Sequence, residues 1–225
     1  MKPYIIVHMM TSIDGRIDCS MLEHLSADEY YVALEQLGPC SQLSGRQTAA
    51  LEWPAVREEA PWMEGAPIGR EAFHKVAPAD TYAIVVDTRG TLRWQAAEED
   101  GHPILCIVSE QVSEAYLDSL REAGISWIAV GKDRIDLRRA LEILNEQFGV
   151  QHLTIVGGGH ICGGFLEAGL VDEVSLMVAP GIDGRAGQTA VFDGITRQSP
   201  DPYHLRLEKV ERVGKDVVWL RYKVQ

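Results

Sequence analysis

Apolar runs that are typical of β-strands alternate with amphipathic helical segments along most of this chain. The strand-like runs are residues 4–10, 81–87, 103–109, 126–130, 152–156 and 173–180. Helical periodicity separates several of them, over 113–124, 136–149 and the short segment 161–169. Because parallel strands need crossover connections, the alternation predicts an α/β fold with a mainly parallel sheet flanked by helices.

The last part of the chain has a different pattern. Residues 203–224 alternate apolar and polar side chains on both sides of the turn sequence Gly214-Lys215-Asp216. This pattern predicts an antiparallel hairpin at the edge of the sheet. No linker, repeat or low-complexity segment interrupts the sequence, so we expect a single domain over residues 1–225.

The first 80 residues contain two further predicted helices. Ser26 and Glu29 have the spacing of a capping box, and the helix that they begin is expected to end at Gly38-Pro39. A second helix is expected to open at 44–48 and to continue to residue 60, interrupted at Pro54. The segment 60–80 is rich in proline and glycine and is expected to be irregular. Trp53 and Trp62 border it, either as walls of a cleft or as loop packing.

Composition excludes several classes of partner. The net charge of −12 and the isoelectric point near 5.0 disfavour binding to nucleic acid or to an anionic membrane. No stretch approaches the ~20 apolar residues of a membrane span, and Asp14 comes too early for a signal peptide, so we expect a cytoplasmic protein. The cysteines at 19, 40, 106 and 162 have no zinc-type spacing, which predicts reduced thiols and no metal.

A glycine cluster follows the strand-like run at 152–156. Gly157, Gly158 and Gly159 stand where a helix begins, and Gly163 and Gly164 follow within it. The first turn of a helix offers N–H groups to a phosphate, and glycine lets that phosphate approach the backbone. The cluster departs from the dinucleotide-binding fingerprint at Cys162 and from the Walker motif at Gly164. These residues alone leave two interpretations open, a pyrophosphate site and a structural strand-to-helix turn.

Other segments make the chain resemble a known family. "SIDGR" (12–16), "GRQT" (45–48), "VVDTRGTLR" (85–93), the segment 156–180 and "GRAGQTAVFDG" (184–194) occur in this order. Together they resemble the reductase domain of riboflavin biosynthesis, over residues 3–224 and most specifically over 153–194. The resemblance implies a dihydrofolate-reductase-like, three-layer α/β/α fold. It also implies NADPH as the hydride donor.

The resemblance assigns cofactor-binding residues to several strand ends. Arg46 would meet the 2′-phosphate of NADPH, because a guanidinium offers paired donors to a phosphate. Gly69-Arg70 is a rival for the same motif, but it lacks the following threonine. The residues implied in cofactor binding are Gly45, Arg46, Gln47, Thr48, Asp87, Thr88, Ser109, Gly157, Gly158, Gly159, His160 and Ile161.

The substrate side departs from the family pattern. The family typically has Lys at the position of His8 and Glu at the position of Val156. By analogy, the substrate would contact His8, Ser12 and Ser26. A histidine satisfied inside the sheet and a simple N-cap serine are the alternatives for His8 and Ser26.

Asp14 is the candidate catalytic residue. It would shape the reaction site or supply a proton to the product. The alternative is ordinary turn chemistry, in which the aspartate of an Asp-Gly pair bonds to neighbouring backbone.

Three functions are compatible with these residues. The first is an NADPH-dependent reductase of a pyrimidine, a pterin or a similar small heterocycle. The second is the riboflavin-pathway reductase itself, acting on 5-amino-6-(5-phosphoribosylamino)uracil. The third is a non-catalytic NADPH-binding protein of the same fold. The family also implies a homodimer, with the hairpin residues Val217, Trp219 and Tyr222 at the shared edge.

Overall fold

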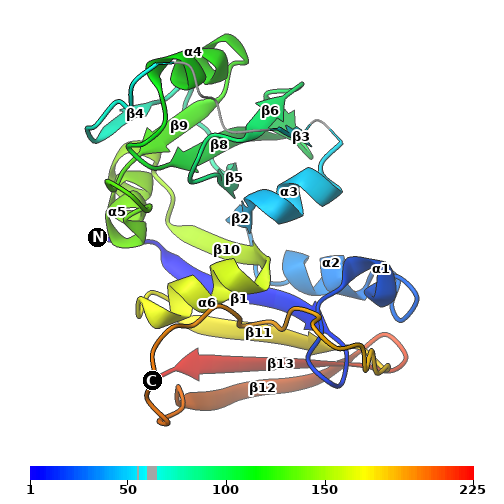
Figure 1. The fold of residues 1–225 in the computed structure, drawn as a ribbon. Helices are drawn as coiled ribbons and strands as arrows, with labels where there is room; N and C mark the ends of the chain where they lie inside the picture. Colours follow the sequence, from blue (N-terminus) through cyan, green and yellow to red (C-terminus); the bar gives the residue numbers. More distant parts are fainter. Residues whose placement is uncertain (55, 60–64) are drawn as a thin grey trace. The chain divides into compact units, whose positions relative to one another are not determined.

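The computed structural model of the chain describes residues 1–54, 56–59 and 65–225 (Figure 1). Trp62 lies outside the described residues. The chain divides into two compact units. Tyr4–Pro39 and His152–Gln225 form what we call the terminal unit, and Met1–Pro3 and Cys40–Gln151 form the central unit. That residues 1–225 act as one domain stays a prediction.

The sheet of the terminal unit contains the chain's first strand and its last. Its order is β12 (Leu205–Val213), β13 (Val217–Val224), β11 (Glu173–Val178), β1 (Tyr4–Thr11) and β10 (His152–Gly157). β1 is parallel to both β10 and β11, whereas β13 is antiparallel to β11 and β12. β1 is buried along almost its whole length, which explains its continuous apolar sequence. The predicted strands and the C-terminal hairpin are therefore confirmed in this unit.

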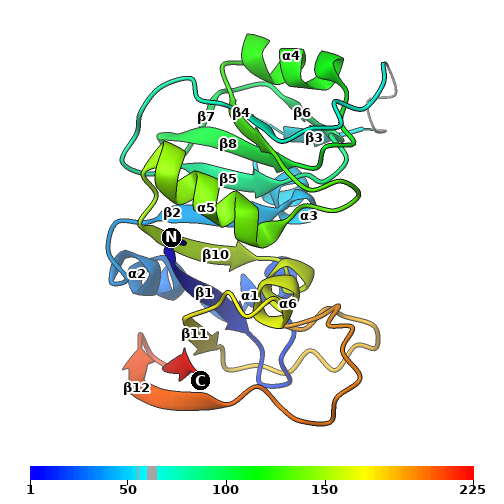
Figure 2. The ribbon, with the colours of Figure 1, turned by 90° about the vertical axis from the view of Figure 1, so that its left-hand side faces the viewer.

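Three helices belong to the terminal unit. α1 (Cys19–Leu22) and α2 (Glu29–Glu35) pack against a buried cluster that includes Met10, Met177 and Trp219. α6 (Gly159–Glu167) follows β10 directly, and Figures 1 and 2 show it running beside β10 and β1. The predicted short helix at 161–169 is confirmed, with a start two residues earlier.

The central unit has its own set of parallel strands. β2 (Ser41–Gly45), β5 (Ala83–Val86), β8 (His102–Val108) and β9 (Ser126–Ala129) are parallel, and β4 (Ala72–His74) adds an antiparallel edge. β7 (Glu98–Glu99) pairs with β8, and β3 (Val56–Glu58) pairs with β6 (Leu92–Trp94) in a separate two-stranded sheet. The three predicted strands of this unit are confirmed as β5, β8 and β9.

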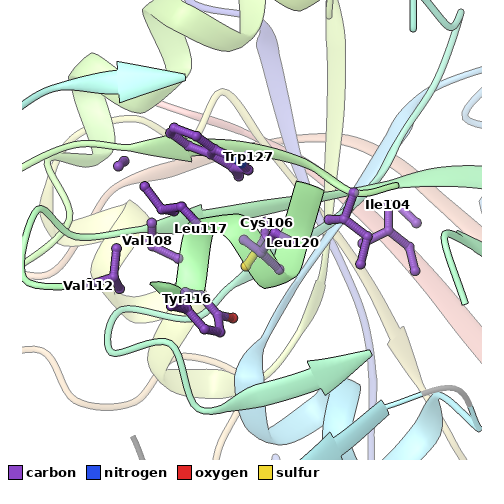
Figure 3. Packing of buried hydrophobic residues seen from close by; sticks show 11 residues of the cluster. Ile104, Cys106, Val108, Val112, Tyr116, Leu117, Leu120 and Trp127 are labelled. Atoms are coloured by element: carbon purple, nitrogen blue, oxygen red, sulfur yellow. The ribbon is translucent and has the colours of Figure 1, made fainter. Parts of the chain in front are cut away.

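The helices of the central unit are α3 (Arg46–Glu52), α4 (Glu114–Glu122) and α5 (Leu137–Phe148). Ser113 and Asp136 cap the N-termini of α4 and α5 through their side chains. Figure 3 shows Tyr116, Leu117 and Leu120 of α4 against the buried side chains of β8 and β9, among them Trp127. This packing holds the carboxyl ends of β8 and β9 in place.

Two predictions about the first 60 residues are wrong. The N-cap of α2 is Asp28 rather than Ser26, although the Glu29 carboxylate does reach back to the backbone N–H of Ala27 at 2.7 Å. The second predicted helix is too long: α3 ends at Glu52, and β3 takes the place of its second half. Pro54 explains this break, because a proline cannot donate to the preceding helical turn.

Candidate functional site

Three parallel strands of the central unit end beside the cofactor residues predicted in that unit. β2 ends at Gly45, β5 ends just before Asp87, and β8 ends just before Ser109. Because β2 pairs with β5 and β5 with β8, their carboxyl ends lie at one edge. Ligands of parallel α/β sheets bind at such edges. The structure thus brings Gly45–Thr48, Asp87–Thr88 and Ser109 to a common edge of this unit.

The segment Gly45–Thr48 joins β2 to α3. Gly45 is the N-cap of α3 in an extended conformation, and it makes no side-chain cap because it has no side chain. Arg46 is the first helical residue and is partly exposed, as is Thr48, whereas Gln47 is exposed. The side chain of Arg46 therefore starts at the strand edge with access to solvent.

Asp87 shapes the turn after β5 through its side chain. The carboxylate is fully buried and accepts hydrogen bonds from the Thr91 hydroxyl (3.1 Å), the Leu92 N–H (2.8 Å) and the Tyr116 hydroxyl (3.0 Å). Ser109 is also buried, and its hydroxyl donates to the Thr88 carbonyl at 2.7 Å. The side chains of Asp87 and Ser109 therefore form hydrogen bonds with other protein atoms, while Thr88 remains partly exposed at the turn.

In the terminal unit, the glycine cluster forms the junction between β10 and α6. Gly157 has a φ of 144°, and the peptide bond between Gly157 and Gly158 is cis. Gly158 is the N-cap of α6 and leaves the helix start without a side-chain cap. The nine-residue helix α6 therefore begins without a capping side chain, at the carboxyl end of a parallel strand. The helix dipole stabilises an anion at such a position.

Two glycines of the cluster are required by packing. A Cβ on Gly159 would lie 2.1 Å from the Ala190 carbonyl oxygen, and one on Gly163 would lie 2.0 Å from that of Asp193. The backbone of residues 189–193 therefore lies directly on one face of α6. Gly164 has nothing within 4 Å of the equivalent position, so contacts in the described structure do not require a glycine there. The structural interpretation therefore applies to Gly159 and Gly163, and the pyrophosphate site stays a prediction.

Asp14 lies in the loop after β1, at the same edge of the terminal unit as the glycine cluster. Its carboxylate accepts hydrogen bonds from the Ser12 hydroxyl (2.7 Å) and from the backbone N–H groups of Asp183 and Gly184 (2.9 Å each). The Ser12 bond, followed by those of Gly184 and Asp183, holds the pKa of Asp14 far below its usual range. An ionised carboxylate has no proton to donate, so the geometry favours the shaping role of Asp14 over the proton-donating one.

His8 is fully buried in β1 and has partners at both ring nitrogens. Nδ1 lies 2.8 Å from the Ser175 hydroxyl, and Nε2 lies 3.3 Å from the Tyr30 carbonyl oxygen. The Tyr30 ring stacks on the imidazole, with centroids 4.6 Å apart. The pKa of His8 is lowered to about 4, chiefly by burial and with a smaller contribution from the positive charge of Arg221. These are the surroundings of a neutral histidine satisfied inside the sheet, which was the alternative to substrate contact.

Ser26 also has a partner other than the one expected. Its hydroxyl donates to the sulfur of Met10 at 3.1 Å. Ser26 is partly exposed, and its contact with Met10 connects the segment before α2 to β1.

Val156, where the family typically has Glu, is partly buried in β10. The sequence did not identify Ser175 and Tyr30 as the partners of His8, or Trp219 as the partner of Ser175; the one available signal was the polar Ser175 within an apolar strand.

A charged cluster lies on the sheet of the terminal unit. Glu173 is buried and forms ion pairs with Arg221 and with Lys223, the latter at 2.6 Å, and it accepts a hydrogen bond from Tyr4. Burial raises the pKa of Glu173, but these three partners outweigh it and the net shift is downward. A shallow cavity of about 280 Å³ is lined by Glu173, Glu208, Lys209, Arg221 and Lys223. Its cations face carboxylates, so the cluster is suited to joining strands rather than to binding an anion.

Within residues 1–54, 56–59 and 65–225, no three His, Cys, Asp or Glu side chains are grouped so as to hold a metal ion. All four cysteines are free thiols. In the same described residues, no helix has the length and apolar character needed to cross a membrane.

Comparison with known proteins identifies the family. Two relatives are named 2,5-diamino-6-ribosylamino-4(3H)-pyrimidinone 5′-phosphate reductase. The protein of Methanothermobacter thermautotrophicus is 27% identical over 97% of this chain and 97% of its own length. That of Archaeoglobus fulgidus is 25% identical over 96% of this chain and 95% of its own.

Solved structures share the fold. A pyrimidine reductase-like protein of Corynebacterium diphtheriae has a TM-score of 0.74 at 19% identity, covering 99% of this chain and 92% of its own. The riboflavin biosynthesis reductase Rib7 of Saccharomyces cerevisiae has a TM-score of 0.65 at 16% identity, covering 100% and 90%. The predicted dihydrofolate-reductase-like α/β fold is confirmed. The model of the RibD C-terminal domain matches residues 3–219, and the chain therefore belongs to the RibD C-terminal domain family.

Proposed function

We propose that this protein is an NADPH-dependent reductase that transfers a hydride to a ribosylaminopyrimidine phosphate. The observation that carries the proposal is the near full-length match to two relatives named as reductases of 2,5-diamino-6-ribosylamino-4(3H)-pyrimidinone 5′-phosphate. Their name makes this diaminopyrimidinone the first substrate to test. The corresponding uracil, 5-amino-6-(5-phosphoribosylamino)uracil, is the second.

The helix start of α6 fits a cofactor phosphate. In this proposal the backbone of Gly157–Ile161 lies against the pyrophosphate, and the N–H groups before Ile161 hold it, which the absence of a side-chain cap on α6 supports. The Ile161 N–H itself donates to the Gly158 carbonyl at 2.9 Å. Bound NADPH supplies the hydride. Arg46, at the start of α3, contacts the 2′-phosphate, and Gln47, Thr48 and Thr88 lie at the same strand edge of the central unit. Asp87 and Ser109 contribute by holding their turns rather than by side-chain contact with the cofactor.

The proposed substrate-contacting residues His8, Ser12 and Ser26 all belong to the terminal unit. Ser12 and Asp14 lie at the edge where β1 ends, and Ser12 donates to Asp14, so their contribution is to shape this loop. His8 and Ser26 face protein atoms, and contact with substrate requires that the His8–Tyr30 stack and the Ser26–Met10 contact open. The proton that the product requires comes from water or from a group other than the ionised Asp14.

Two measurements test the proposal. NADPH is first titrated against the protein with cofactor fluorescence as the readout, and absence of binding would refute it. The loss of NADPH absorbance is then followed with the diaminopyrimidinone and with the uracil. NADPH binding without turnover of either compound would instead favour a non-catalytic NADPH-binding protein.

We also propose a homodimer formed through the C-terminal hairpin, and a cytoplasmic location. The support for the dimer is a row of exposed apolar side chains on one face of the hairpin, with Leu207 51% and Val210 59% exposed beside Leu205 and Val218. Of the residues first expected at this edge, Val217 and Trp219 are buried on the opposite face, under α2. Sedimentation equilibrium of the wild-type protein and of Val210→Lys tests the dimer: a monomeric wild type refutes it.

A further inference from the structure

The loop that follows β11 is tied to the loop that follows β1. We call residues 181–194 the strap. The Ile13 N–H donates to the Gly181 carbonyl at 2.8 Å, and a guanidinium N–H of Arg16 donates to the Gln188 carbonyl at 2.5 Å. Between these two points, the Asp14 carboxylate accepts both the Asp183 and the Gly184 N–H groups. Asp14 thus uses each of its oxygens to hold the middle of this attachment.

The far end of the strap packs on the first turn of α6. The Ala190 carbonyl oxygen and the Thr189 methyl lie where a Cβ of Gly159 would stand, at 2.1 and 2.8 Å. The Asp193 N–H donates to the Gly159 carbonyl at 3.1 Å. Figure 1 shows the segment after β11, coloured yellow to orange, running along α6 before it reaches β12. The strap therefore connects the loop that contains Asp14 to the backbone at the start of α6.

We propose that Asp14 is a positioning residue for cofactor binding at the N-terminus of α6. It acts through the strap: the carboxylate fixes Asp183 and Gly184, and the strap in turn holds Thr189–Asp193 against Gly159. The inference rests on the proposed function, because it takes the start of α6 as the site of the cofactor pyrophosphate. Asp14 itself touches neither cofactor nor reacting atoms in this scheme.

The chain contains a matched control. Glu167, at the other end of α6, accepts hydrogen bonds from the Thr196 N–H (3.0 Å) and hydroxyl (2.9 Å) and from the Arg197 N–H (2.8 Å). Glu167 is thus a second solvent-accessible carboxylate that holds the connection between β11 and β12, but beyond the strap and away from the first turn of α6. A general loss of loop order would follow from the loss of either carboxylate, whereas positioning of the α6 start depends on Asp14 and not on Glu167.

The test compares Asp14→Asn, Ser12→Ala and Glu167→Gln with the wild type. Asparagine keeps one acceptor oxygen and loses the charge, so we expect Asp14→Asn to weaken NADPH binding by roughly fivefold or more. Hydrogen exchange of amides 183–184 and 159–161 should rise in the same variant. Ser12→Ala removes one donor and should give a smaller change in the same direction, which keeps the test valid should Asp14→Asn fold poorly. Glu167→Gln should leave the Kd for NADPH unchanged.

Two results would overturn the inference. One is an Asp14→Asn protein whose Kd for NADPH equals that of the wild type; the other is equal weakening in Asp14→Asn and Glu167→Gln. Amide hydrogen exchange at residues 159–161 is also measured in the wild type and in Asp14→Asn without cofactor. A wild type that does not bind NADPH would therefore refute the proposed function, while unchanged exchange at 159–161 in Asp14→Asn would separately refute the transmission through the strap.

Discussion

The indole N–H of Trp219 donates to the Ser175 hydroxyl oxygen at 2.7 Å, and this bond fixes the direction of a buried chain of hydrogen bonds. The indole can only donate, so the Ser175 proton is directed to His8 Nδ1. The Tyr30 carbonyl can only accept, so His8 Nε2 carries the imidazole proton. With its pKa lowered to about 4, His8 is neutral at pH 7, and its neighbours select the tautomer that is protonated at Nε2.

This arrangement predicts a loss of stability in mild acid. The pKa of His8 is about 4 in the folded protein, below the ordinary value of 6.5, so the unfolded state binds more protons between these two pH values. The contribution of His8 is complete above pH 6.5 and is lost as the pH falls toward 4. The loss is on the order of 3 kcal/mol of unfolding free energy. Urea unfolding of the wild type and of His8→Gln across this range measures it, and equal slopes for the two proteins would contradict it.

The two adjacent glycines of α6 are expected to respond to alanine in opposite ways. Gly164 has free space around its Cβ position, so Gly164→Ala should stabilise the protein by about 0.5–1 kcal/mol through helix propensity. At Gly163 the added methyl meets the Asp193 carbonyl oxygen, and Gly163→Ala should destabilise it by roughly 1–3 kcal/mol. Chemical denaturation of the pair gives both values, and shifts of the same sign would show that strap packing does not govern this helix face.

The Asp87 turn gives a third prediction. Tyr116→Phe removes the hydroxyl that donates to Asp87 at 3.0 Å and leaves a buried carboxylate with one partner fewer. We expect a loss of about 1.5–3 kcal/mol of unfolding free energy, because hydrogen bonds to buried charged groups are costly to remove. Thermal and urea unfolding measure the change. Tyr203→Phe, which removes a hydroxyl from a partly exposed ring, is the control, and an equal effect in both variants would argue against a special role for the Asp87 contact.

These residues also show what the sequence could and could not predict. β1, β5, β8, β9, β10 and β11 were predicted because an apolar run records burial on both faces of a parallel strand. β2 was missed because Ser41, Gln42 and Ser44 interrupt its apolar pattern. The strand-end motifs could be placed at sheet edges from their order alone. The partners of Asp14, His8 and Asp87 could not, because Asp183, Ser175 and Tyr116 are each about 30 or more residues away along the chain.

The last prediction concerns selectivity between the two nicotinamide cofactors. Arg46 begins α3 at the carboxyl end of β2, and in the proposed function its guanidinium meets the 2′-phosphate that NADPH has and NADH lacks. Arg46→Ala should weaken NADPH binding by about tenfold or more and leave NADH binding nearly unchanged, because hydrogen bonds to charged groups contribute about 1.5–3 kcal/mol. Fluorescence titration with both cofactors measures the two Kd values. Arg70→Ala is the matched control, since Gly69-Arg70 is the other glycine-arginine pair considered for this role. Equal losses for NADPH and NADH would refute the assignment of Arg46, and a selective loss in Arg70→Ala would transfer it to the rival position.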